Sequence, residues 1–202
     1  MKIAIIGAHG VGKTTLTKAL ETTTGIAAPV PTPMHNPEPG KLKSLQDCTN
    51  EEMIRLSQRR FAERIAQEQA TDNVISDGSV LHEWSYASVR LSLGIFPTST
   101  QEKSTNPKIN IQLELIEMFA EEAMKYAESS YDLLFFIPIE ISLPEENSPI
   151  SDRFQLEAQK HLQNLLTKSN AQFTTLSGTH SERLDHALNV IEQATQKLPV
   201  SV

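Results

Sequence analysis

The chain alternates short apolar runs with longer segments in which apolar residues recur at helical spacing. The short runs predict five strands, at about residues 2–6, 26–30, 73–77, 132–138 and 171–176. Strands that alternate with helices are typical of a parallel sheet with helices on both faces. We therefore predict an α/β fold, a three-layer sandwich around a five-stranded parallel sheet.

Residues that start or stop helices mark the ends of the periodic segments. Thr49 and Asn50 can cap a helix, Gly94 and Pro97 can end one, and Pro107 can open one. The predicted helices cover about residues 12–22, 51–70, 79–94, 107–129, 152–168 and 181–196. The stretch PVPTPMHNPEPG holds five of the eleven prolines and is expected to be a surface loop. No linker divides residues 1–202, so we expect a single domain.

Parallel sheets of this kind bind ligands beyond the carboxyl ends of their strands. The polar segments that follow the predicted strands are therefore the first places to look for a site. These segments are residues 7–14, the proline-rich loop, Asp77, residues 139–152 and Gly178.

The segment GAHGVGKT at residues 7–14 matches the phosphate-binding pattern G-x-x-x-x-G-K-[ST]. It follows an apolar strand and opens a helix, so its backbone N–H groups and the helix N-terminus can face one anion. Lys13 adds a full positive charge, and Thr14 offers a hydroxyl to Mg²⁺. We therefore expect ATP and Mg²⁺ as cofactors, with the nucleotide held by Gly7, Ala8, His9, Gly10, Val11, Gly12, Lys13, Thr14 and Thr15.

Other short motifs narrow the class of phosphate-loop protein. The base-reading motif N-K-x-D of GTPases is missing from the sequence. A transporter-type ATPase would carry a glutamate directly after the acidic residue that ends its second motif strand. In this chain Gly78 follows the acidic residue Asp77. A ring ATPase would need a longer chain. Of these classes of phosphate-loop protein, the small-molecule kinases are the class that the sequence still fits.

Several stretches resemble one family along nearly the whole chain: GAHGVGKTT, VISDGSVLHEWSYA, YDLLFFIP, SDRFQLEAQKHLQNLL and FTTLSGTHSERL. They look like the phosphate-loop nucleoside and nucleotide kinases, close to the AAA-type family that includes the kinase domain of nicotinamide riboside kinases. The resemblance implies a mobile lid at about residues 139–153. It also implies that Asp77 orients Mg²⁺ or accepts the proton of the substrate hydroxyl. By the same resemblance, the lid residue Arg153 contacts the transferring phosphate, and Gly178 belongs to the loop that passes the adenine.

The sequence departs from this family at two places. Many relatives follow the acid at the position of Asp77 with an arginine, and here the residue is Gly78. Many also carry a glutamate and an arginine after the second strand, where this chain has PVPTPMH. The usual base is therefore missing, which favours Asp77 as the base.

Four further side chains are candidates for contact with the phosphoryl acceptor. Glu83, Tyr86 and Arg90 share one helix face just past Asp77. Arg60 lacks the glutamate partner at a spacing of four residues that Arg55, Arg59 and Arg64 each have. The alternative is that all four belong to solvated or ion-paired helix faces. His82 is expected to be a surface or capping histidine.

Composition limits the partners. The net charge is −7, with 25 acidic and 18 basic residues, which argues against a nucleic-acid partner. The single cysteine, Cys48, excludes an internal disulfide. No apolar run is long enough to span a membrane, and we expect a cytoplasmic protein. The long helix at 107–129 offers a surface on which two copies could form a homodimer.

These observations favour an ATP-dependent kinase that transfers the γ-phosphoryl group to a hydroxyl or phosphate of a nucleoside, a nucleotide or a related metabolite. Lys13, Asp77 and Arg153 are the expected catalytic residues, and Thr14 and Asp77 the expected metal ligands. One alternative is a regulatory ATPase that acts with a protein partner. A second is a polynucleotide end kinase, which the acidic net charge disfavours.

Overall fold

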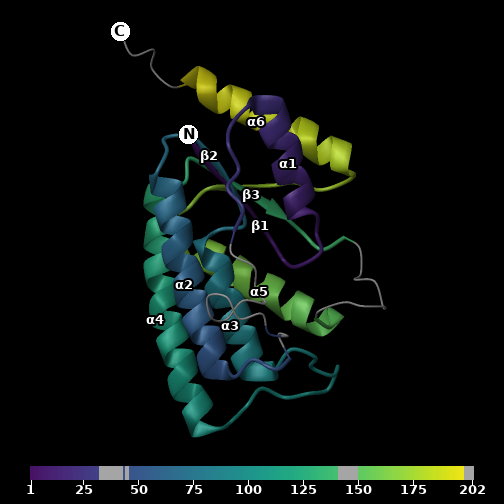
Figure 1. Cartoon of the computed structure of the whole chain (residues 1–202). Helices are drawn as coiled ribbons and strands as arrows, with labels where there is room; N and C mark the ends of the chain where they lie inside the picture. The colour runs from purple at the N-terminus through teal and green to yellow at the C-terminus, as the bar shows by residue number, and fades with distance from the viewer. Residues whose placement is uncertain (32–42, 44–45, 141–149, 198–202) are drawn as a thin grey trace.

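The computed structural model describes residues 1–31, 43, 46–140 and 150–197 (Figure 1). In this part of the chain, four parallel strands form one sheet in the order β2-β1-β3-β4. The strands are β1 (Lys2–Gly7), β2 (Val74–Asp77), β3 (Leu133–Ile137) and β4 (Phe173–Thr175). Because all four strands run the same way, their carboxyl ends meet at one edge of the sheet.

Helices cover both faces of the sheet (Figure 1). Ile3 and Ile5 of β1 pack into a core with α1 (Lys13–Thr24) and α6 (His180–Lys197). The alternate residues Ala4 and Ile6 pack into a second core, because successive strand residues face opposite sides of the sheet. That core includes residues of α2 (Asn50–Gln69), α3 (Val80–Leu93), α4 (Pro107–Ser130) and α5 (Asp152–Lys168). The predicted α/β fold, with a parallel sheet between helical layers, is confirmed.

The prediction of five strands is wrong for the described residues, because residues 26–30 form no strand. This segment gives only one backbone hydrogen bond to the sheet, in which the carbonyl of Ala27 accepts from the N–H of Ile75 at 3.0 Å. The N–H of Ala28 instead donates to Oε1 of Glu21 at 2.9 Å. Pro29 has no N–H to donate, so the segment cannot continue a ladder along the edge of β2.

The helix ends follow the capping residues in the sequence. The Thr49 side chain accepts from the N–H of Glu52 at the start of α2, and Gly94 follows the last residue of α3. Much of the predicted lid, residues 141–149, and of the proline-rich loop, residues 32–42, lies outside the described residues. None of the described helices is both long and apolar enough to cross a membrane.

Candidate active site

The loop between β1 and α1 lies at the carboxyl edge of the sheet and carries the phosphate-binding motif. Gly7 must be small, because a Cβ there would come within 2.6 Å of the carbonyl oxygen of Ile137 and 2.8 Å of Val11 Cγ2. Gly12 caps α1 with a φ of +96°, a backbone conformation that favours glycine. The structure thus explains why Gly7 and Gly12 of the motif are glycines. The N-terminus of α1 follows directly after the loop.

Lys13 begins α1 and points back over the loop. Its Nζ donates a hydrogen bond of 2.6 Å to the carbonyl oxygen of Ala8. Burial lowers the pKa of Lys13 from 10.5 to about 8, although the nearby carboxylate of Asp77 acts in the opposite direction. An anion beside this ammonium would favour its charged form, which makes the loop suited to phosphate.

Thr14 and Asp77 join the loop to the end of β2. The Thr14 hydroxyl donates a hydrogen bond of 2.6 Å to Oδ2 of Asp77. Hydroxyl and carboxylate oxygens are ligands that suit Mg²⁺, and these two converge at the mouth of the loop. The described residues contain no group of three or more His, Cys, Asp or Glu residues that could hold a metal ion. A Mg²⁺ ion at Thr14 and Asp77 would therefore take its other ligands from phosphates and water.

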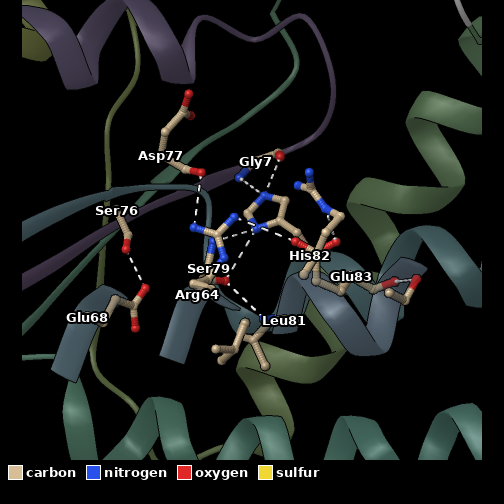
Figure 2. A network of polar contacts seen from close by, with 12 residues as sticks. Gly7, Arg64, Glu68, Ser76, Asp77, Ser79, Leu81, His82 and Glu83 are labelled. Carbon is tan, nitrogen blue, oxygen red and sulfur yellow. Dashed lines mark hydrogen bonds and ion pairs between the residues drawn. The ribbon is translucent and has the colours of Figure 1, made fainter. Parts of the chain in front are cut away.

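The backbone around Asp77 is held by two contacts that sequence reasoning missed. Nη1 of Arg64 donates to the carbonyl oxygen of Asp77 at 3.2 Å (Figure 2). The N–H of Gly78 donates to the carbonyl oxygen of Ile5 at 3.0 Å. Arg64 comes from α2, and no local pattern in the sequence connects it to this turn. Its nearest sequence partner, Glu68, suggested a pair within the helix.

Arg60 and Glu83, both predicted acceptor residues, meet in a buried ion pair. Arg60 Nε lies 2.7 Å from Oε2 of Glu83, and Arg64 Nη2 lies 3.6 Å from Oε1 of the same carboxylate. The Glu83 side chain is 0% exposed. Buried charges persist only when they are paired, so α2 supplies two cations that compensate one carboxylate on α3.

Tyr86 and Arg90 lie progressively farther along α3. The ring of Tyr86 packs against His82 and Phe154, with centroids 5.9 and 6.2 Å away, and burial raises the pKa of its hydroxyl. Arg90 lies in the last turn of α3, about 15 Å along the helix axis from its start. The structure therefore places Glu83 and Tyr86 in the early turns near Asp77, and Arg90 at the other end of the helix.

Arg90 contributes to a cavity of about 330 Å³ beyond the end of α3. Its Nη2 donates to the carbonyl oxygen of Cys48. The other residues that line the cavity are Gln46, Asn50, Gly94, Ile95 and Phe96. Glu83, Tyr86 and Arg90 thus follow one another along α3 as predicted, but Arg90 lines a separate cavity at the end of the helix.

Arg153 and Gly178, the remaining predicted residues, make contacts within the protein. Arg153, in the first turn of α5, donates to the carbonyl oxygen of Thr98. The N–H of Gly178, which follows β4, donates to both carboxylate oxygens of Glu140 at 3.1 Å. Neither contact reaches the phosphate loop.

Arg183, in the first turn of α6, links Glu140 beyond β3 to the phosphate loop, and sequence reasoning missed it. Its Nη1 donates to the carbonyl oxygen of Val11 at 2.9 Å, and its Nη2 donates to Oε2 of Glu140 at 2.7 Å. This pairing with Arg183 lowers the pKa of the Glu140 carboxyl. The signal lay in the stretch FTTLSGTHSERL, which contains Arg183 but gives no partner for it.

Comparisons with known proteins agree with this architecture. The family model described as AAA domain matches residues 2–183, so the chain belongs to this family. The predicted membership of the AAA-type family is thereby confirmed. No curated protein matches the sequence.

Three solved structures illustrate the shared fold. Deoxyadenosine kinase from M. mycoides, with dCMP and dCDP bound, has a TM-score of 0.64 at 15% identity, covering 96% of this chain and 100% of that one. NadR in complex with NAD and AMP-PNP has a TM-score of 0.64 at 15% identity, covering 100% of this chain and 51% of that one. Thymidylate kinase from Candida albicans has a TM-score of 0.60 at 15% identity, covering 96% and 92%. At this identity the likeness establishes the fold.

Proposed function

We propose that this protein is an ATP-dependent small-molecule kinase, whose acceptor is a nucleoside, a nucleotide or a related metabolite. The observation that carries the proposal is the hydrogen bond of 2.6 Å between Thr14 and Asp77 at the mouth of a glycine loop that contains Lys13. This arrangement brings a cation, two oxygen ligands and a helix N-terminus to one point. Phosphoryl transfer depends chiefly on such positioning and charge neutralisation.

In the proposed reaction, a hydroxyl or phosphate oxygen of the acceptor forms a bond to the γ-phosphorus of ATP. The bond between that phosphorus and the β–γ bridging oxygen breaks, and ADP leaves. Lys13 and the backbone N–H groups of the loop hold the phosphates, where charge is spread over several oxygens. The ammonium of Lys13, which donates to Ala8, is the group that would exchange this contact for a phosphate oxygen.

In this proposal the two carboxylate oxygens of Asp77 have different roles. One oxygen can accept the proton of the acceptor hydroxyl, and the other can serve with Thr14 as a metal ligand. A bound Mg²⁺ would neutralise negative charge on the β- and γ-phosphates. Because Arg64 holds the Asp77 carbonyl and Gly78 bonds to Ile5, the carboxylate stands on a fixed turn.

The acceptor is proposed to bind along the start of α3. Arg60, whose side chain is 10% exposed, is the member of the Arg60–Glu83 pair that can donate to polar groups of the acceptor, and the buried Glu83 carboxylate holds its guanidinium in place. Tyr86, one turn farther, adds an aromatic surface. Arg90 belongs to this surface only for an acceptor long enough to reach the end of α3.

The nucleotide base is proposed to lie near Gly178, whose N–H donates to the Glu140 carboxylate. Arg183 donates to the same carboxylate and to the carbonyl oxygen of Val11 in the phosphate loop. Arg153, at the N-terminus of α5, is proposed to meet the transferring phosphate, which requires it to release Thr98. The domain is proposed to span residues 1–202, with a lid at 139–153. Water exclusion by such a lid would limit hydrolysis of ATP.

Acceptor-dependent formation of ADP tests the proposal. The protein is incubated with ATP and Mg²⁺, and ADP is measured after separate addition of nucleosides, nucleoside monophosphates and other hydroxylated metabolites. At least one class is expected to stimulate ADP formation, and the Lys13→Met variant should show none. ADP formation that no metabolite stimulates, but that a protein partner does, would contradict the proposal and favour a regulatory ATPase.

A further inference from the structure

A buried histidine connects the phosphate loop to the turn that carries Asp77. His82, in the first turn of α3, is 4% exposed and lies between Gly7 and Ser79 (Figure 2). Its Nδ1 lies 2.9 Å from the backbone nitrogen of Ser79, and its Nε2 lies 2.8 Å from the carbonyl oxygen of Gly7. The predicted capping role of His82 is thus confirmed, whereas the predicted surface position is wrong.

Only one form of the ring satisfies both short contacts. The N–H of Ser79 is a donor, so Nδ1 must be an unprotonated acceptor, and a neutral ring then carries its proton on Nε2. That Nε2–H can donate to the carbonyl oxygen of Gly7. The opposite tautomer would leave two donors facing each other at Ser79 across 2.9 Å, and would rely on longer contacts of 3.2 Å to Gly7 N and 3.3 Å to Ser79 Oγ. In the assigned tautomer the N–H of Gly7 faces the Nε2–H, but across the longer distance of 3.2 Å.

The environment of the ring favours this neutral form. Burial is the main reason why the pKa of His82 lies well below its usual range, and the positive charges of Lys13 and Arg64 act in the same direction. The ring is also packed edge-on against Tyr86. His82 is therefore held as a neutral donor to the phosphate loop at neutral pH.

The contact determines the orientation of the first peptide of the phosphate loop. In a trans peptide the C=O and the following N–H point in opposite directions, so a fixed carbonyl at Gly7 fixes the N–H of Ala8. The carbonyl of Ala8 is in turn the acceptor for Lys13. Two successive peptides of the loop are thus held from within the protein, one of them by a residue of α3.

We propose that His82 is a positioning residue of the nucleotide site, whose Nε2–H holds the Gly7 peptide in the orientation that binds phosphate. The inference rests on the proposed function only in assuming that the loop binds a nucleotide. It gives His82 two separable duties, because Nδ1 caps α3 through Ser79 while Nε2 serves the phosphate loop.

Two variants separate these duties. Oδ1 of asparagine stands two bonds from Cβ, as Nδ1 of histidine does, so His82→Asn keeps the cap and loses the donor to Gly7. The side-chain nitrogen of glutamine stands three bonds from Cβ, as Nε2 does, so His82→Gln keeps the donor and loses the cap. The probe is AMP-PNP with Mg²⁺, titrated by calorimetry, and thermal unfolding without nucleotide reports the cap.

His82→Asn is expected to weaken AMP-PNP binding by about 3- to 10-fold, the value of one hydrogen bond, with a Tm close to wild type. His82→Gln is expected to bind within about twofold of wild type, and loss of the cap should lower its Tm by roughly 2–4 °C. In the wild-type protein, ¹⁵N NMR of the ring should show the Nε2–H tautomer.

Wild-type affinity in His82→Asn, or an Nδ1–H tautomer in the wild-type protein, would overturn the inference. A protein that binds AMP-PNP as expected but phosphorylates no acceptor would contradict the proposed function and leave the role of His82 intact. A wild-type protein that binds no nucleotide would overturn both.

Discussion

The Thr14 hydroxyl donates to Oδ2 of Asp77 at 2.6 Å, joining the first turn of α1 to the last residue of β2. The two residues are separated by 63 positions in the sequence and meet because β1 and β2 are neighbouring parallel strands. In the proposed function, the groups that bind phosphate and accept the proton therefore lie within one site.

Asp77→Asn should reduce turnover far more than nucleotide affinity. The amide keeps the shape of the side chain but cannot accept the acceptor proton, so we expect kcat to fall by about 10²- to 10⁴-fold. Steady-state kinetics with the identified acceptor gives the measurement. Asp72→Asn, an exposed position just before β2, is the matched control and should leave kcat unchanged. Equal kcat values in Asp77→Asn and Asp72→Asn would exclude Asp77 as the base.

Nucleotide affinity should decrease above pH 8. Lys13 has a pKa of about 8 in the protein, so at higher pH it loses the proton that phosphate requires. Binding must then be accompanied by proton uptake, and we expect AMP-PNP to bind about tenfold more weakly at pH 9 than at pH 7. Lys13→Arg, whose guanidinium stays charged, should give a flat profile over this range. A wild-type profile as flat as that of Lys13→Arg would contradict the lowered pKa.

Lys13→Met should stabilise the protein while it abolishes nucleotide binding. The pKa of Lys13 is lower in the folded protein than in the unfolded chain, so below pH 8 the partly buried charge disfavours folding. Removing it should raise the Tm at pH 7 by roughly 2–4 °C. The control is Lys18→Met, an exposed residue of the same helix, for which we expect little change. A lower Tm for Lys13→Met would show that the lysine is stabilising.

Glu83→Gln should be strongly destabilising, because it leaves Arg60 and Arg64 without their buried counter-charge. Breaking a buried pair costs about 3–5 kcal/mol, and urea unfolding can measure the loss. The control is Glu122→Gln, which removes an exposed pair with Lys125 at 2.6 Å and should cost about 0–1 kcal/mol. Similar losses in both variants would mean that the Glu83 pair is not effectively buried.

Local chemistry explains why the phosphate loop and Asp77 could be predicted. The motif is contiguous, so the expected roles of its glycines, Lys13 and Thr14 follow from their neighbours in the sequence. Strand periodicity then placed Asp77 at the same edge of the sheet. Both inferences needed only short-range patterns and the rule that parallel strands end together.

The long-range polar contacts could not be predicted. Spacing along α2 pairs Arg64 with Glu68, yet the buried Glu68 accepts hydrogen bonds from Tyr126 and Tyr131 at 3.1 and 3.0 Å, and Arg64 turns to Glu83. Helical spacing identifies neighbours on one helix but not the side chains that a second helix brings. The same limit applies to His82, whose partner Gly7 is 75 residues away.

The prediction of a fifth strand at residues 26–30 was wrong for a different reason. The apolar residues of segment 26–30 suit a strand, but pairing along the edge of the sheet also requires backbone N–H donors. Pro29 has no N–H, and the N–H of Ala28 donates to Glu21 instead. Hydrophobic pattern alone therefore overestimated pairing at the edge of the sheet.

Direct detection of the transferred phosphoryl group tests the central claim. The protein is incubated with ATP, Mg²⁺ and a pooled library of nucleosides, nucleotides and hydroxylated metabolites, and mass spectrometry follows masses shifted by one phosphoryl group. We predict a shifted mass in the wild-type reaction that is missing with Lys13→Met. Binding of ATP with no shifted mass in any acceptor class would contradict the assignment as a small-molecule kinase.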